Sequence, residues 1–304
     1  MSQSSNNLVR RVGGLSHRWL PFADAATVDL TLPRLWRLSL FQLSTGMAIV
    51  LLTGTLNRVM VVELGQGTSL VSLMLAIPLL MAPARALIGY RSDHHRSYLG
   101  WRRIPYLWSG TLMQFGGLAF MPFALILMIE PHSGPPIIGP IAAMGSFLLT
   151  GLGMHVSQTA GLALATDLAT EESRPRVVAL LYLMLLVGMI SSAVIFAALL
   201  DDFSYVRLIQ VIQSAAVITL ILNVAAMWKQ EVRHPELTDH ERERPTFGSA
   251  WGEFINLPKA RRLLWALGLG TMGFTMQDIL LEPYGAHVLG LSVSETTLLT
   301  ALFA

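Results

Sequence analysis

The stretch GYRSDHHRSYLGWRRIPYLWSG, residues 89–110, sets a cluster of arginines and histidines between two of the most apolar segments of the chain. Each neighbouring segment holds about 20 mostly uncharged residues, the length that an α-helix needs to cross the hydrocarbon core of a bilayer. Short charged connections between such segments are typical of a chain that crosses a membrane repeatedly. The stretch therefore predicts a chain folded in a bilayer and not around a soluble core.

The composition of the whole chain agrees with this prediction. Hydrophobic residues make up 53% of the 304 residues and charged residues 13%, whereas a soluble domain carries about 25% charged residues. The mean hydropathy of +0.55 points the same way. The net charge of +2 gives no reason to expect a nucleic-acid partner, because membrane sidedness accounts for where the cations stand. The absence of cysteine excludes disulfides, cysteine-ligated zinc and thiol catalysis from these residues.

Seven complete membrane spans and part of an eighth are expected along the chain. The predicted spans are 38–62, 69–90, 104–129, 137–168, 177–200, 205–228 and 263–289. An eighth apolar run begins near Ser292 and reaches Ala304, which is too short to cross, so we expect the native polypeptide to be longer. The predicted fold class is an all-α polytopic membrane protein.

The loops predict which way the chain is oriented. Lys and Arg concentrate in every second connection: Arg10, Arg11, Arg18, Arg34 and Arg37 before the first span, Arg91, Arg96, Arg102 and Arg103 after the second, Arg174 and Arg176 after the fourth, and Lys229, Arg233, Arg242, Arg244, Lys259, Arg261 and Arg262 after the sixth. The intervening connections carry almost none. Because positive residues mark the cytoplasmic side of a membrane, the N-terminus is predicted to be cytoplasmic.

The long charged connection after the sixth span predicts a division of the chain into four parts. We expect a cytoplasmic N-terminal arm at 1–34, a six-helix bundle at 35–228, a cytoplasmic linker at 229–262, and the start of a second bundle at 263–304. A weak internal repeat supports the division, because residues 62–77 can be laid over 287–303 with a few apolar matches.

Two loops carry motifs with a physical rationale. In the first, glycine permits close approach of helix ends, the aspartate can pair with an arginine across the bundle, and the other arginines can reach anionic headgroups. This loop contains Gly89, Asp93, Gly100, Arg102 and Arg103, and the second loop contains Asp167, Arg174 and Arg176. Both loops resemble the loop signatures of the major facilitator superfamily, although the distance from Asp93 to Gly100 is longer here.

Three longer segments resemble a more specific family. Residues 91–110, 151–189 and 272–292 together look like the bacteriochlorophyll delivery family, the PucC/LhaA group of phototrophic bacteria. The resemblance implies an assembly factor in the bacterial inner, intracytoplasmic photosynthetic membrane. It implies bacteriochlorophyll as the cofactor, with carotenoid or lipid as further candidates. The implied partners are light-harvesting antenna polypeptides, the reaction centre or pigment-synthesis enzymes, and membrane lipids.

His155 in the fourth span is the leading candidate for a pigment ligand. It is surrounded by small and polar residues, including Gly151, Gly153 and Gln158, which could form a face that admits a flat macrocycle. A neutral imidazole can bind the magnesium of bacteriochlorophyll as its axial ligand, so His155 is also the candidate metal ligand. In the alternative interpretation, His155 bonds a neighbouring helix and the glycines only permit close packing.

The seventh span holds the second group of candidates, Gln277, Asp278 and Glu282. Asp278 and Glu282 are four residues apart and should share a helix face. They could contact a pigment together with Asn57 of the first span, relay protons beside a helix broken near Pro283, or pair with polar and cationic groups of the first two spans. The groups available for pairing are Asn57, Arg58 and Arg85.

Three functions are left open by the sequence. The first is a pigment-binding assembly factor, the second a proton-coupled secondary transporter, and the third a scaffold for antenna and reaction-centre proteins without pigment. No enzyme is expected, because the chain lacks a phosphate-binding loop, a G-x-S-x-G elbow and an H-E-x-x-H motif. Metal binding by the adjacent His94 and His95 is not expected, because no third ligand stands nearby.

Overall fold

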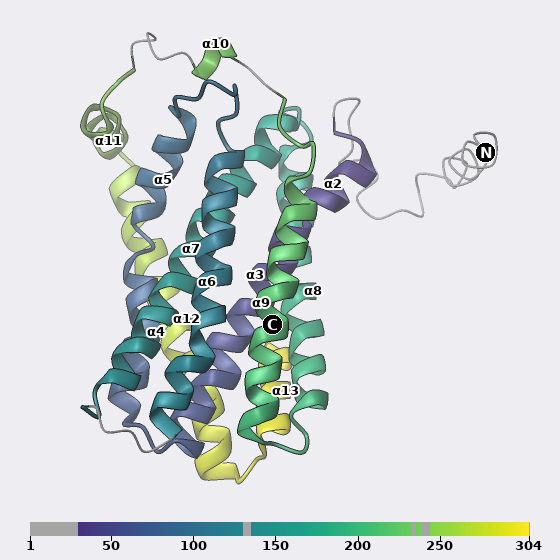
Figure 1. The fold of residues 1–304 in the computed structure, drawn as a ribbon. Helices are drawn as coiled ribbons and strands as arrows, with labels where there is room; N and C mark the ends of the chain where they lie inside the picture. The colour runs from purple at the N-terminus through teal and green to yellow at the C-terminus, as the bar shows by residue number, and fades with distance from the viewer. Residues whose placement is uncertain (1–29, 130–134, 233–234, 239–243, 304) are drawn as a thin grey trace, which may run out of the picture.

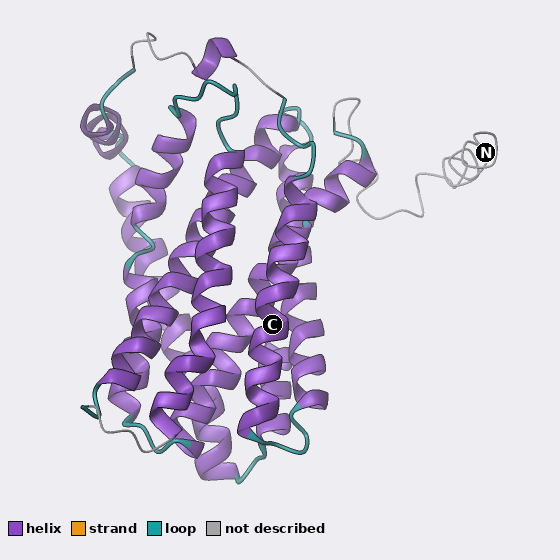
Figure 2. Cartoon of the chain, in the orientation of Figure 1, coloured by secondary structure: helices purple, strands orange, loops and turns teal. Residues whose placement is uncertain are grey.

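The computed structural model describes residues 30–129, 135–232, 235–238 and 244–303. All regular structure in this part of the chain is helical (Figure 2), which confirms the predicted fold class. Six helices are long and apolar enough to cross a membrane: Leu32–Glu63, Thr68–Asp93, Ile104–Ile129, Ile138–Leu168, Arg174–Leu199 and Tyr205–Met227. The predicted third span agrees with the helix at both ends, and the other predicted ends among these six lie within six residues of the observed ones.

The first span is the central helix of the bundle. It consists of α2 (Leu32–Leu38), α3 (Leu40–Ile49), η3 (Val50–Leu56) and η4 (Val59–Glu63), the last two wound as π-helix. In its apolar window 83% of the residues are buried, against 22–39% in the other five spans. Helix α2 starts at Leu32, near the end of the segment predicted as the arm, and residues 1–29 lie outside the described part.

The second span is interrupted where an unbroken helix was predicted. Helix α4 (Thr68–Leu80) ends before a turn at 81–83, and α5 (Ala84–Asp93) continues beyond it. Pro78 and Pro83 flank the interruption. Proline has no backbone N–H and its ring clashes with the preceding turn, which explains why the helix stops here.

The remaining spans surround the first one (Figure 1). They are α6 (Ile104–Ile129), α7 (Ile138–Leu168), α8 (Arg174–Leu199) and α9 (Tyr205–Met227). Glycines allow these helices to approach closely. A Cβ on Gly153 of α7 would lie 2.6 Å from the carbonyl oxygen of Gly110 in α6, and one on Gly188 of α8 would lie 2.8 Å from Cα of Leu43 in α3.

The chain then forms two short helices and two that lie against the first span. These are α10 (Pro235–Thr238), α11 (Phe247–Asn256), α12 (Ala260–Leu289) and α13 (Val293–Phe303). Only Leu257, Pro258 and Lys259 separate α11 from α12. Helix α12, the predicted seventh span, is 30 residues long but is not one of the six described helices that are apolar enough to cross a membrane, so a seventh span is not confirmed. It contacts η3, η4, α11 and α13, and most of its first twenty residues are exposed.

Candidate functional site

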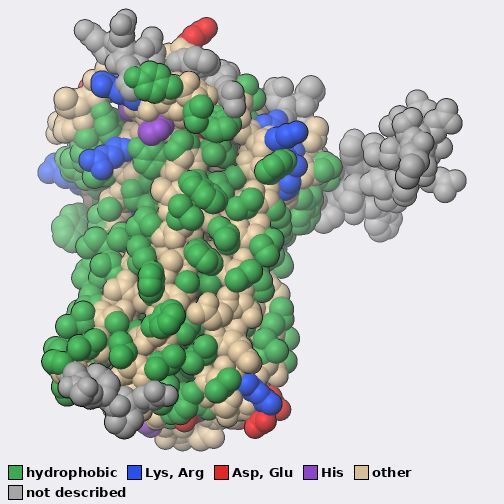
Figure 3. Space-filling model, in the orientation of Figure 1, with side chains coloured by type: hydrophobic (Ala, Val, Ile, Leu, Met, Phe, Trp, Pro, Cys, Tyr) green, Lys and Arg blue, Asp and Glu red, His purple; other side chains and the backbone are tan. Residues whose placement is uncertain are grey.

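Charged side chains gather at one end of the bundle, which we call the arginine-rich end. Figure 3 shows Lys and Arg mostly at this upper end of the visible face, above a largely hydrophobic middle. The described arginines at this end include Arg34, Arg37, Arg91, Arg96, Arg102, Arg103, Arg174, Arg176 and Arg244.

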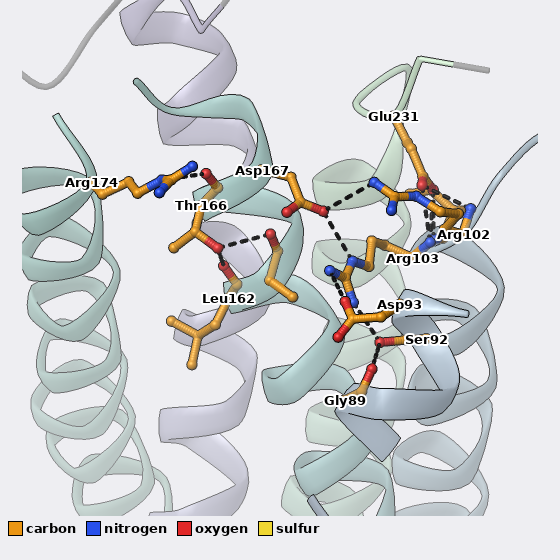
Figure 4. Close-up of polar contacts among 12 residues, drawn as sticks. Gly89, Ser92, Asp93, Arg102, Arg103, Leu162, Thr166, Asp167, Arg174 and Glu231 are labelled. Atoms are coloured by element: carbon orange, nitrogen blue, oxygen red, sulfur yellow. Dashed lines mark hydrogen bonds and ion pairs between the residues drawn. The ribbon is translucent and has the colours of Figure 1, made fainter. Parts of the chain in front are cut away.

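Arg103 lies at the centre of this end, with only 5% of its surface exposed (Figure 4). It forms an ion pair with Asp93 at the end of α5, and its Nε donates to Oδ2 of Asp167 in α7 at 3.1 Å. Its Nη1 donates to Oγ of Ser92 at 2.7 Å. Arg102 reaches the same Asp167 oxygen at 3.6 Å. The buried guanidinium of Arg103 thereby joins the segment just before α6 to both α5 and α7.

Glu231, which was not singled out from the sequence, caps helix α6. Its carboxylate accepts hydrogen bonds from the backbone N–H groups of Arg102 at 2.8 Å, Arg103 at 3.0 Å and Ile104 at 2.8 Å. A carboxylate at a helix N-terminus satisfies N–H groups that have no partner within the helix and interacts favourably with the helix dipole. Since Glu231 follows α9, this cap fastens the end of the sixth span to the start of the third.

The remaining motif residues lie around this cluster. Gly100 has a φ of 78°, a left-handed conformation that favours glycine. Gly89 accepts a bond from Ser92 through its carbonyl, but a Cβ there would lie an ordinary 3.7 Å from Thr159, so close approach does not require glycine. Arg174 lies outside the cluster, 3.9 Å from Glu171, and Arg176 is exposed.

His155 bonds a neighbouring helix, as the alternative interpretation proposed. Its Nε2 lies 2.9 Å from the carbonyl oxygen of Pro78 beside the interruption between α4 and α5. A carbonyl only accepts, so Nε2 carries the proton. The other nitrogen, Nδ1, is buried without a hydrogen-bond partner in the described part of the chain.

The glycine face around His155 is filled by neighbouring helices and does not form the open groove that the pigment interpretation required. A Cβ on Gly151 would lie 2.8 Å from Cγ of Pro78, and one on Gly161 would lie 2.7 Å from the ring of Phe41. The spacing of small residues therefore signals helix packing at this position.

Gln158 belongs to a polar chain inside the bundle. Its Nε2 donates to Gln42 at 3.2 Å, and its Oε1 accepts from Nη2 of Arg85 at 3.0 Å. Arg85 also donates to Oγ1 of Thr159 at 3.2 Å. The Arg85 side chain thus turns toward α7 at the level of Thr159, and it forms no ion pair among the described residues.

The first span contacts α12, the predicted seventh span, but the residues that bond each other differ from the predicted pairs. Asn57 donates from Nδ2 to the backbone oxygen of Ile279 at 2.8 Å. Glu282 is only 1% exposed and accepts a hydrogen bond from Thr300 of α13. Arg58 pairs with Glu63 at 2.6 Å and reaches the carbonyl of Leu291 at 3.2 Å. No ion pair of Glu282 is present among the described residues.

The other candidate residues of α12 lie in different surroundings. Helix α12 continues through Pro283, so the expected break is absent. Glu282 is buried inside the bundle. Gln277 is exposed on α12. The side chain of Asp278 lies outside the described part of the structure, so its pairing stays a prediction.

A pocket between α5 and α11 was missed by the sequence reasoning. It has a volume of about 470 Å³, and its lining includes Arg85, Tyr90, Asp93, His94, Phe247, Trp251 and Phe254. We call it the α5–α11 pocket. Two signals were available: Phe247, Trp251 and Phe254 stand at helical spacing in FGSAWGEFIN, and His94 follows Tyr90 by four residues. Nothing in the sequence brings α11 to α5, which is some 150 residues earlier in the chain.

The fold and the buried polar contacts define a multi-pass α-helical membrane protein. Residues 55–304 match the family described as PUCC protein. The chain belongs to this family, since the match covers well over half of its length.

Similar proteins carry related names. The chain is 55% identical over 310 aligned residues to "Protein PucC" of Rhodovulum sulfidophilum, covering 100% of this chain and 68% of that protein. It is 56% identical over 298 residues to "Uncharacterized protein in puhA-bchM intergenic region" of Rhodobacter capsulatus, covering 97% and 62%. It is 28% identical over 272 residues to "Bacteriochlorophyll synthase 44.5 kDa chain" of Rhodobacter capsulatus, covering 88% and 60%. The chain thus spans about two thirds of the length of these relatives.

Proposed function

We propose that this protein is a light-harvesting complex assembly factor, which binds bacteriochlorophyll and delivers it to antenna polypeptides in the photosynthetic inner membrane. The observation that carries the proposal is membership of the PUCC protein family, together with a relative named for bacteriochlorophyll synthase. In this proposal the N-terminus and the arginine-rich end face the cytoplasm, as the distribution of positive residues favours. The protein carries pigment and has no catalytic step of its own.

The outer surface supports a role beside small membrane helices. On α8 a stripe of exposed side chains at four-residue spacing runs along the bundle: Tyr182 at 51%, Leu186 at 39%, Ile190 at 43% and Val194 at 49%. Residues four apart lie on one face of a helix. Such a face suits lipid or a single-span partner helix, which is the form of partner that the proposal assigns to the antenna.

The polar groups inside the bundle support the assembly role over transport of a polar substrate. Gln158 bonds both Gln42 and Arg85, and Asn57 bonds a backbone oxygen. Polar side chains that line a transport path need to be free to exchange partners with a substrate. These four side chains instead make contacts that hold helices together.

Deletion of the gene for the full-length protein from its phototrophic host tests the proposed function. We expect the near-infrared absorption of the antenna to fall relative to that of the reaction centre, and to return on complementation. Unchanged antenna absorption in the deletion strain would show that the protein is not an assembly factor. Antenna subunits that copurify with a colourless protein would favour the pigment-free scaffold.

Proton-coupled transport is a second candidate, and the buried Glu282 favours it. One of its carboxylate oxygens, Oε2, has no hydrogen-bond partner in the described part of the chain. Unpaired carboxyl groups inside membrane proteins often serve proton relays. Glu282→Gln separates the two functions, because the amide keeps the shape but cannot carry a proton. We expect this variant to restore antenna absorption in the deletion strain; failure to restore it, with normal protein abundance, would favour transport.

A further inference from the structure

We infer that the α5–α11 pocket is the bacteriochlorophyll site and that Nε2 of His94 is the axial ligand of the magnesium ion. This inference rests on the proposed function and adds the place and the ligand. It also departs from the expectation drawn from the sequence, which favoured His155 and set His94 aside.

The backbone around His94 fixes which ring nitrogen can bind a metal. Nδ1 of His94 lies 2.9 Å from the backbone oxygen of Tyr90, one helical turn earlier. A carbonyl oxygen has no proton to give, so Nδ1 must be the donor. In the neutral ring the lone pair is then on Nε2, which has no bonding partner among the described residues. A histidine oriented through one nitrogen by a carbonyl is the usual arrangement of a metal-binding imidazole.

The ring of His94 is also held in place from the side. It lies against the ring of Tyr90 with centroids 4.4 Å apart and planes inclined by 31°. The Tyr90 hydroxyl donates to the backbone oxygen of Pro245, and Arg244 donates to the backbone oxygen of His94. These bonds join the end of α5 to the segment just before α11, so the imidazole and the opposite wall of the pocket are positioned together.

The pocket suits a flat aromatic macrocycle. Its wall on α11 is a row of aromatic side chains, in which Phe247 stacks on Trp251 at 6.0 Å and Trp251 lies 5.7 Å from Phe254. Its volume of about 470 Å³ lies within the roughly 300–1,000 Å³ of small-molecule sites. Arg85 lines the pocket with two of its nitrogens bonded to α7 and none described for Nη1, which leaves a donor for the carbonyl groups at the edge of a bacteriochlorin.

A single histidine is sufficient for this ligand. The ring nitrogens of bacteriochlorophyll already hold the magnesium, and only an axial position needs a protein atom. The described residues contain no group of three or more metal-ligating side chains, so a bare metal ion finds no such site there. His155 is the weaker candidate, because its Nε2 is used by Pro78 and its free Nδ1 is enclosed by packed helices.

The test compares pigment binding by the purified full-length protein and its His94→Phe variant, with His95→Phe and His155→Phe as matched controls. Bacteriochlorophyll bound per protein is read from near-infrared absorption in mild detergent. We expect His94→Phe to lower bound pigment by at least about tenfold, as loss of a metal ligand does. The controls should keep it, since the ring of His95 packs on Tyr106 instead of lining the pocket.

Two further measurements distinguish a ligand from a structural residue. His94→Gly leaves a space that free imidazole can fill, so added imidazole should restore pigment binding. Bacteriopheophytin, which has the same macrocycle without magnesium, should bind the unaltered protein at least about tenfold more weakly than bacteriochlorophyll. Equal binding of the two pigments, or a His94→Phe variant with full pigment and an unchanged spectrum, would overturn the site. Neither result would decide the assembly function, because the deletion experiment tests that function independently.

Discussion

Arg103 illustrates what a single buried cation does at the end of a membrane bundle. Its side chain is 6% exposed, while its partners Asp93 and Asp167 are 48% and 38% exposed. Removing a guanidinium from water is costly, and the cost is offset only when its donors are satisfied. Here two carboxylates and the Ser92 hydroxyl accept from it. The residue therefore stabilises this end mainly by joining elements and not by its net charge.

We expect Arg103→Ala to destabilise the protein by about 3 kcal/mol, the lower end for breaking a buried pair, because both carboxylates keep some contact with water. Arg174→Ala is the control, since Arg174 is 49% exposed and pairs with an exposed Glu171 at 3.9 Å; it should change stability by less than about 0.5 kcal/mol. Thermal unfolding of the detergent-solubilised protein measures both. Equal melting temperatures for the two variants would contradict the role assigned to Arg103.

The sequence predicted which side chains form ion pairs only where the two residues are close in the sequence. The motif predicted that Asp93 pairs with an arginine, and it pairs with Arg103, ten residues away. The partner of Arg85 could not be predicted, because it depends on how α5 is rotated after the turn at 81–83. The α5–α11 pocket depends on the same rotation and on a helix far along the chain.

Among the elements, α6 depends on a cap that comes from another part of the chain. We expect Glu231→Ala to cost roughly 1–2 kcal/mol, because the backbone N–H groups of the first turn lose their acceptor and the helix dipole loses a favourable charge. Hydrogen exchange should then accelerate at the amides of Arg102, Arg103 and Ile104. Glu236→Ala, at an exposed position of α10, is the control and should leave these amides unchanged. Slow exchange in both variants would mean that another group caps α6.

The contact between α6 and α7 should be sensitive to added volume at one face only. Gly153→Ala forces a methyl group against Gly110 and should destabilise by about 1–3 kcal/mol, as overpacking does. Gly145→Ala on the same helix meets nothing within 4 Å and should be neutral or stabilising, because alanine favours helix by up to about 1 kcal/mol over glycine. The difference in melting temperature between the two variants measures the effect, and a more stable Gly153→Ala would contradict the packing described.

Helix positions were largely predictable because hydropathy is a local property, as the agreement at Ile104–Ile129 shows. The interruption of the second span was not predicted, although Pro78 and Pro83 are plain in the sequence. Single prolines are tolerated inside membrane helices, as Pro122 in α6 shows, so their presence alone does not predict that a helix is interrupted. The π-helical winding of η3 and η4 leaves no compositional signal that we recognise.

At the scale of the whole molecule, the orientation in the membrane can be tested directly. These 304 residues contain no cysteine, so single cysteines can be introduced without removing any of them. Leu99, 58% exposed at the arginine-rich end, should be labelled by an impermeant maleimide only in inside-out vesicles when changed to cysteine. Asp202, whose side chain is 86% exposed at the other end, should be labelled only in spheroplasts. The reverse pattern would contradict the proposed sidedness.

The central position of the first span could not be predicted from the sequence. All six of these helices are apolar enough to cross a membrane, yet only Leu32–Glu63 is mostly enclosed. Its contacts with α8, α9, α12 and α13 are made by segments distant in the sequence. Burial inside a membrane bundle is decided by packing against these segments, since lipid is as apolar as the helices themselves.

The short connection between α11 and α12 links the position of one helix to that of the other. Helix α11 is one wall of the α5–α11 pocket, and only Leu257, Pro258 and Lys259 join it to α12. We expect a change in the tilt of α12 to alter the width of the pocket, because so short a connection leaves α11 little freedom to stay in place. By thermodynamic reciprocity, a molecule bound between α5 and α11 would then bias that tilt by the same free energy. A probe on α12 would therefore report binding at the pocket.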